Sequence, residues 1–200
     1  MFHKFLGFPF PGGEDFMVKL TLRGVARVLK HTPSQAAPMT PEILSEIAGV
    51  LDTSYPLHSV MYCCFLFMFF LFARRCHFVP DTSSAADLQR LVKRSQVVFT
   101  QLGLTVTFYH TKTRQVGGKP LVIPLPRIPD SVLCPVAAFE RMCYLVPLPP
   151  GCALFSLPQG YGPGPLTYQP FQKALRSCVQ VLGYDPQSFS SHSFRRGGAT

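Results

Sequence analysis

The sequence has 200 residues and a mass of 22.2 kDa, enough for one globular domain with a hydrophobic core or for part of a larger one. Hydrophobic residues make up 47% of it and charged residues only 14%, which excludes an intrinsically disordered chain. The net charge of +9 and the pI of about 9.4 favour an anionic partner, with nucleic acid as the first expectation and a membrane surface as the second.

Cysteine usage indicates a reduced, intracellular protein. The seven cysteines are an odd number without a regular framework, and the adjacent pair Cys63 and Cys64 lies inside an apolar run, as core thiols do. No CxxC occurs, so we expect no cysteine-based zinc site.

The first forty residues predict one short helix and a linker. Residues 18–30 (VKLTLRGVARVLK) have helical spacing and a basic face. The three cations of that face, at i, i+4 and i+7, are Arg23, Arg27 and Lys30. Residues 31–39 carry two prolines among Ser, Gln and Ala, a composition typical of linkers. The sequence therefore divides into residues 1–39 and residues 40–200.

Two further helices are predicted before the middle of the chain. Thr40 can cap the first, Pro41 stands at its first position, and the following apolar residues repeat at helical spacing. The second contains the run VMYCCFLFMFFLFA at residues 60–73, which is apolar throughout. Its 14 residues are fewer than the roughly 20 that span a bilayer, so a buried core helix is favoured over a membrane-associated protein, and no membrane partner is expected.

The middle of the chain changes to a strand pattern. β-branched and aromatic residues gather at residues 97–99 and 104–110, and another apolar stretch follows at residues 121–125. These segments predict a small antiparallel sheet. Three further helices are predicted at residues 135–144, between Thr167 and Gly183, and from residue 188 onward. The expected fold class is α+β, mainly helical, with a small antiparallel sheet.

No acidic residue occurs between residues 88 and 129. The seven cations of this stretch are Arg90, Lys93, Arg94, Lys112, Arg114, Lys119 and Arg127. A solvated face would be the ordinary explanation, but such segregation of one sign of charge is better explained by an anionic ligand.

His192 and Arg195 form an HxxR pair near the end of the sequence. At i and i+3 of a helix they project from one face. An imidazole beside a guanidinium suits a phosphoryl group, because the planar fork of Arg binds two oxygens and His transfers a proton near neutral pH. The pair alone also fits a histidine at a helix end beside a surface arginine.

Four segments in a fixed order resemble the tyrosine recombinases, the phage-integrase-like superfamily, and most closely the enzymes of DIRS-, Ngaro- and Crypton-type eukaryotic mobile elements. They are FLFARRCHFVP, TFYHTKTRQVGG, LCPVAAFERM and SHSFRRGGAT, and the likeness extends over roughly residues 18–200. The resemblance implies the catalytic core of that superfamily, preceded at residues 1–39 by the remnant of a core-binding domain.

The resemblance also implies roles for single residues. Arg74, with its neighbour Arg75 as the other candidate, would be the first catalytic arginine, and Arg195 the second. Lys112 on a hairpin would protonate the leaving 5′-oxygen, while His192 would assist proton transfer. The implied reaction is DNA cleavage and rejoining through a 3′-phosphotyrosyl link, which needs no metal and no cofactor. The implied partners are double-stranded DNA and other recombinase subunits on it, and the implied location is the nucleus.

Further cations are expected to contact DNA. They are Arg23, Arg27, Lys30, Arg75, Lys93, Arg94, Arg114, Lys119 and Arg196.

Two departures from the family pattern shape the expectation. His77 stands where the family commonly has an acid, three residues after Arg74. The family's nucleophilic tyrosine follows HxxR by some tens of residues, whereas this sequence ends at Thr200. We therefore expect a C-terminally truncated catalytic domain that binds DNA without cutting it. The alternative is a non-catalytic module, derived from such an enzyme, that binds DNA or a partner protein.

Overall fold

The computed structural model describes residues 16–28, 35–82, 84–109, 119–157, 160 and 164–199, and the chain forms two compact units, Met1–Gln35 and Ala36–Thr200. The first unit contains one described helix, α2 (Phe16–Val28), which confirms the helix predicted at residues 18–30. Arg23 is exposed on it.

The second unit contains the predicted helices and the predicted sheet. Its main helices are α3 (Pro41–Val50), α4 (Pro56–Phe70), α6 (Pro135–Leu145), α7 (Tyr168–Val181) and α8 (Ser191–Gly197). Shorter elements, which the sequence pattern did not reveal, are η1 (Arg75–His77), α5 (Ala85–Gln89), η2 (Arg94–Gln96), β4 (Ser156–Leu157), β5 (Gly164–Pro165) and η3 (Pro186–Ser188).

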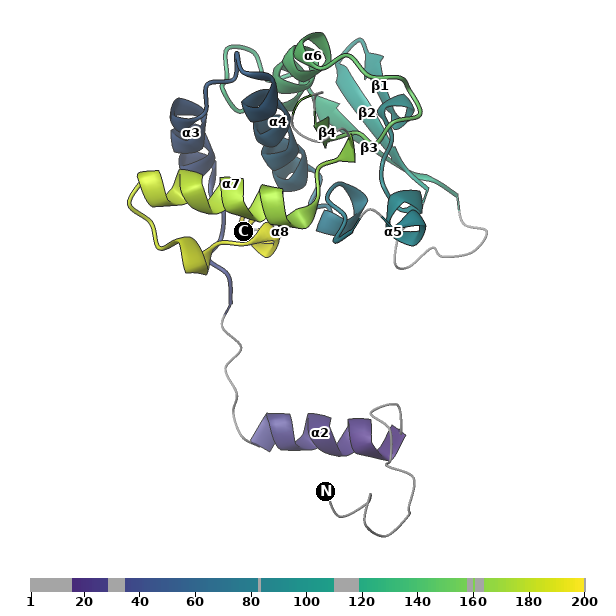
Figure 1. The fold of residues 1–200 in the computed structure, drawn as a ribbon, viewed down its shortest axis with the longest axis vertical. Helices are drawn as coiled ribbons and strands as arrows, with labels where there is room; N and C mark the ends of the chain where they lie inside the picture. The colour runs from purple at the N-terminus through teal and green to yellow at the C-terminus, as the bar shows by residue number, and fades with distance from the viewer. Residues whose placement is uncertain are drawn as a thin grey trace. The chain divides into compact units, whose positions relative to one another are not determined.

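Helix α4 is the centre of this unit. Every residue from Ser59 to Phe69 is buried, as the uniformly apolar sequence predicts. Figure 1 shows α4 between α3 on one side and α6 with the sheet on the other. Since burying one Phe, Leu or Met side chain contributes about 1.5–3 kcal/mol, this helix supplies a large share of the hydrophobic stabilisation. No helix in the described ranges is long and apolar enough to cross a membrane.

The three strands form an antiparallel sheet in the order β1 (Val97–Thr100), β2 (Gly103–Phe108) and β3 (Leu121–Pro126). Its register pairs Val97 with Val106 and Leu104 with Leu125, all four of which are buried. One face of the sheet therefore packs on the core, as expected for a small antiparallel sheet with a solvated second face.

The second unit begins at Ala36, four residues before the boundary that the sequence suggested. The Ala37 N–H donates to the Ser188 carbonyl (2.7 Å), and the Met39 N–H donates to the Ser193 carbonyl (2.9 Å). Met39 is also fully buried. The end of the expected linker is thus part of the core, because it lies against the segment that carries α8.

Candidate functional site

Helix α8 presents the HxxR pair on its exposed face. Ser190 caps the helix, since its Oγ accepts from the His192 N–H (3.3 Å) and its own N–H donates to the Ser193 Oγ (3.0 Å). Ser193 and Phe194 are buried, whereas His192 and Arg195 are exposed. The spacing of the motif therefore separates two polar side chains from the residues that anchor them.

Aromatic packing fixes α8 against the core. The ring of Phe194 stacks on that of Phe65 in α4 with 5.3 Å between centroids, and Phe65 also meets Phe171 of α7 edge-on at 5.4 Å. These rings are buried, so the position of His192 and Arg195 follows from the core and not from a flexible terminus.

The chain that leaves α4 brings a second group of cations to α8. Phe72, two residues after the end of α4, has a left-handed φ of 48°, and Arg74 is extended (φ −74°, ψ 141°) before η1 begins. A cavity of about 310 Å³ lies where this turn meets α8. It is lined by Ala73, Arg74, Arg75, Cys76, Ser191, His192 and Arg195.

The cavity gathers three of the four residues that the resemblance assigned to catalysis: Arg74, His192 and Arg195. Among the described residues no acid lines it, so the charge of this lining is positive. The fourth residue, Lys112, lies outside the described residues.

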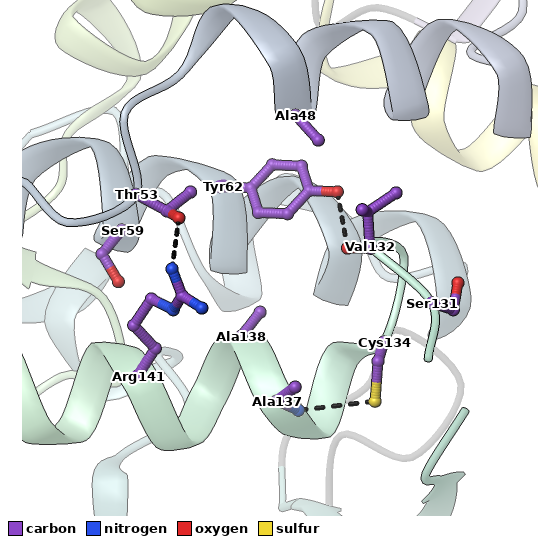
Figure 2. Close-up of a pocket in the computed structure, with 10 residues that line it drawn as sticks. All are labelled: Ala48, Thr53, Ser59, Tyr62, Ser131, Val132, Cys134, Ala137, Ala138 and Arg141. Atoms are coloured by element: carbon purple, nitrogen blue, oxygen red, sulfur yellow. Dashed lines mark hydrogen bonds between the residues drawn. The ribbon is translucent and has the colours of Figure 1, made fainter. Parts of the chain in front are cut away.

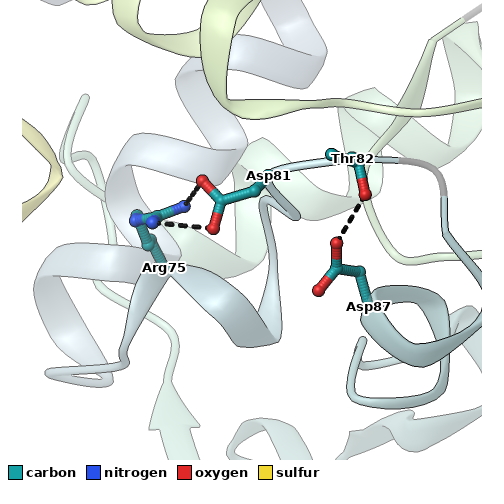
Figure 3. Close-up of polar contacts among 4 residues, drawn as sticks. All are labelled: Arg75, Asp81, Thr82 and Asp87. Carbon is teal, nitrogen blue, oxygen red and sulfur yellow. Dashed lines mark hydrogen bonds and ion pairs between the residues drawn. The ribbon is translucent and has the colours of Figure 1, made fainter. Parts of the chain in front are cut away.

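The two adjacent arginines have different environments. The Arg75 guanidinium makes two hydrogen bonds to the Asp81 carboxylate (2.7 and 2.9 Å), which Figure 3 shows, and it lies 4.5 Å from the centroid of the Tyr168 ring. The bonds to Asp81 raise the pKa of Arg75 further above its usual range. The Arg74 side chain is exposed and has no hydrogen-bond or ion-pair partner among the described residues. Arg74 is thus the arginine whose donors are available to a ligand.

Ser191 is a cavity residue that sequence reasoning missed. It is 3% exposed, and its buried hydroxyl has no hydrogen-bond partner among the residues that the structure describes. Buried polar groups are usually paired, so an unpaired hydroxyl at the wall of a cationic cavity is a candidate donor to a ligand bound there. The sequence gives no signal for it, because one serine among four in residues 188–193 is not distinctive.

Arg94 departs from the expectation that it contacts DNA. It is 8% exposed, its Nε–H donates to the Leu154 carbonyl (2.9 Å) and its Nη1–H to the Cys143 sulfur (3.0 Å). The guanidinium joins η2 to the segment before β4 inside the unit and does not reach the surface. Burial is the main cause that raises the pKa of Cys143, and the neighbouring Arg94 opposes it.

Three of the other expected DNA contacts are exposed: Lys93, Lys119 and Arg196. The Arg196 guanidinium also donates to the Ala36 carbonyl (2.9 Å). Three further expected contacts cannot be placed, since Lys30, Arg114 and the side chain of Arg27 lie outside what the structure describes.

A second cavity, of about 240 Å³, lies between α4 and α6 (Figure 2). Its polar groups already bond to one another: Tyr62 donates to the Val132 carbonyl (2.9 Å) and Arg141 to the Thr53 hydroxyl (2.8 Å). This cavity therefore offers few free donors to a ligand. Within the described ranges, no group of three or more His, Cys, Asp or Glu is placed to hold a metal ion.

No protein-family model and no curated protein sequence matches the chain. Among solved structures it is similar to the site-specific recombinase XerH bound to its difH substrate in a pre-cleavage complex, with a TM-score of 0.56 and 14% sequence identity. The likeness covers 82% of this chain and 42% of the recombinase chain, so the chain spans less than half of that protein's length. Together with the small antiparallel sheet and the buried central helix, it shows that this chain has the α+β fold of a tyrosine recombinase catalytic domain.

Proposed function

We propose that this chain is the catalytic-domain part of a tyrosine recombinase of the mobile-element type and that its cavity binds a phosphate of double-stranded DNA. The observation that carries the proposal is the meeting of Arg74, His192 and Arg195 at one cavity from two distant parts of the sequence. The net charge of +9 and the DNA-bound recombinase of the same fold support it.

The geometry suits charge stabilisation on a phosphodiester. Arg74 and Arg195 are each able to donate charge-assisted hydrogen bonds to non-bridging oxygens, and His192 can position the group and exchange a proton with it. In the proposed reaction a tyrosine hydroxyl gives its proton to His192 and its oxygen bonds to phosphorus, while the bond from phosphorus to the 5′-oxygen breaks. Lys112 gives its proton to that 5′-oxygen, and the phosphotyrosyl ester retains the energy needed for rejoining.

The tyrosine nucleophile of the family follows the HxxR segment. The residues at the cavity supply the phosphate-binding part of such a site, so the proposal for them is DNA binding, in the nucleus and together with other recombinase subunits on the DNA. Cleavage belongs to the proposal only when the nucleophile is supplied.

DNA affinity measured against salt concentration tests the proposal. Binding of a fluorescent duplex should weaken linearly on logarithmic axes, and each lost phosphate contact should reduce the slope by about 0.9. Arg74→Ala and Arg195→Ala should each reduce affinity and slope, whereas Lys173→Ala, an exposed cation of α7 outside the cavity, should change neither. Affinity that is independent of salt, or equal losses in all three variants, would refute a phosphate site at the cavity.

The role of Lys112 needs a different readout. In a protein completed with the family's tyrosine segment, Lys112→Ala should slow cleavage far more than it weakens binding, and a substrate with a better leaving group at the 5′ position should restore the rate. A loss of binding in proportion to the loss of cleavage would make Lys112 a phosphate contact instead.

A further inference from the structure

A second cationic concavity, here called the α5–β2 groove, opens between the end of α5 and the end of β2. Its volume is about 470 Å³, larger than that of the Arg74–Arg195 cavity. The residues that matter for its chemistry are His77, Arg90, Lys93, Gln96, Phe108 and Tyr109.

The charge of the groove is positive. Arg90 and Lys93 are exposed and line it, and no acidic residue in the described part of the chain does. The nearest acid along the chain is Asp87, one helical turn before Arg90, whose carboxylate accepts from the Thr82 hydroxyl (2.7 Å; Figure 3). Hydrogen bonds from Thr82 and Ser84 are the main causes that lower the pKa of Asp87, and the charge of Arg90 adds to them, but Asp87 does not line the groove. The groove therefore favours an anionic ligand.

The walls of the groove are held in place by backbone contacts. Lys93 forms an antiparallel bridge with Ala153, and its N–H donates to the Gln96 Oε1 (2.8 Å). The Val92 N–H donates to the His77 carbonyl (2.8 Å). A groove that is formed before binding loses less entropy when a ligand enters.

An exposed aromatic ring stands beside the two cations. Tyr109 is 57% exposed, whereas Phe108 before it is buried, with its ring 5.4 Å from that of His77. Cations that track a backbone, combined with an aromatic surface for sugars and bases, are the means by which proteins hold nucleic acid strands.

One turn of chain separates the groove from the Arg74–Arg195 cavity. Arg74 lines the cavity and His77 lines the groove, and the His77 N–H donates to the Arg74 carbonyl (3.1 Å) across η1. The two sites therefore adjoin across η1, as sites must that bind neighbouring parts of one extended ligand such as a DNA strand.

We propose that the α5–β2 groove binds the phosphate and sugar of a nucleotide close to the one whose phosphate occupies the Arg74–Arg195 cavity. Arg90 and Lys93 bind that phosphate together, and the Tyr109 ring packs on the sugar. This inference rests on the proposed function, because it assumes a DNA phosphate in the cavity.

The double variant Arg90→Ala/Lys93→Ala tests the phosphate contact. Because the two cations share one phosphate, the salt slope of duplex binding should fall by about 0.9 and affinity at low salt should drop about tenfold. Lys173→Ala is the matched control, and thermal melting checks that each variant folds. A wild-type slope and affinity in the double variant, or an equal loss in the control, overturns the proposal.

Tyr109 supplies an independent test. Tyr109→Phe keeps the ring and should bind as the wild type does, whereas Tyr109→Ala should bind more weakly at every salt concentration with an unchanged slope. Equal affinities for the two variants remove Tyr109 from the site. If Arg74→Ala and Arg195→Ala weaken binding and the groove variants do not, only the groove proposal fails. If none of these variants changes DNA binding, the proposed function fails with it.

Discussion

Gly197 of α8 lies directly against the backbone of Met39, so closely that a Cβ atom at this position would overlap the Met39 carbonyl oxygen. The contact joins the end of the HxxR helix to the segment that begins the second unit. Because the obstacle is the backbone of Met39, it cannot rotate away as a flexible side chain would.

Gly197→Ala should therefore lower the free energy of unfolding by at least about 2 kcal/mol, within the range of overpacking costs, and should weaken DNA binding by displacing α8. Urea denaturation with a parallel binding titration measures both. Gly49→Ala on α3 is the control, since nothing lies within 4 Å of a Cβ there, and a neutral or slightly stabilising effect is expected. Equal stabilities of the two variants would contradict the close contact.

Phe72 adopts a left-handed φ of 48° at the turn that leads from α4 to Arg74. For a residue with a Cβ this conformation costs about 1–2 kcal/mol, whereas glycine adopts it freely. Phe72→Gly should thus be more stable than Phe72→Ala by about 1 kcal/mol, the reverse of the usual order. Both variants lack the aromatic ring, so its contribution cancels in the difference between their free energies of unfolding. A more stable Ala variant would show that the turn is unstrained.

The sequence predicted the main elements well because local signals and the fold agree. Thr40 and Pro41 begin α3 as predicted, with the Thr40 Oγ1 accepting from the Ile43 N–H (3.3 Å), and the apolar run forms the buried helix α4. The HxxR spacing likewise placed His192 and Arg195 on one exposed face of a helix.

The sequence could not distinguish cations by environment. Arg74 and Arg75 are adjacent, and only the tertiary position of Asp81 and Tyr168 shows which one is already paired. Arg94 is one of seven cations in an acid-free stretch, yet its partners are the Leu154 carbonyl and the Cys143 sulfur, far along the chain. Such contacts leave no periodic pattern, since they depend on where loops from other segments pack.

The different environments of the two arginines predict opposite phenotypes. Arg75→Ala removes the paired bonds to Asp81 and the contact with Tyr168, and should cost about 1 kcal/mol of stability, a modest value because the pair is partly exposed. Arg74→Ala should change the free energy of unfolding by less than about 0.5 kcal/mol relative to the wild type, and it should weaken DNA binding. Denaturant titration and DNA anisotropy on both variants separate the roles. The reverse pattern would make Arg75 the phosphate ligand.

Ser191→Ala should raise stability while lowering DNA affinity. Its hydroxyl is buried without a partner, and such a group costs about 1–3 kcal/mol in desolvation, so its removal should stabilise the protein by about 1 kcal/mol. If the hydroxyl donates to a bound phosphate, the same variant binds DNA less tightly. Ser193→Ala on the same helix is the control and should destabilise, because the Ser193 Oγ accepts from the Ser190 N–H. A Ser191→Ala variant that destabilises equally would imply a partner for the hydroxyl within the protein.

Tyr62 predicts a stability difference that depends on pH. Its hydroxyl donates to the Val132 carbonyl (2.9 Å; Figure 2), so Tyr62→Phe should cost about 1 kcal/mol near neutral pH. Burial raises the pKa of Tyr62 from 10.0 to about 12. Between these values the folded wild type holds a proton that the unfolded chain has released, so its stability falls as pH rises.

The Phe variant lacks this titration, so the stability advantage of the wild type should stay constant below pH 10, shrink as the pH rises above 10, and reverse before pH 12. Urea midpoints of both proteins across this range measure the gap. The buried thiols also titrate at high pH, since burial raises the pKa of Cys178 to about 11, but they are present in both proteins and cancel in the difference. A gap that stays constant up to pH 12 would mean that the Tyr62 hydroxyl ionises as readily in the folded protein as in the unfolded chain.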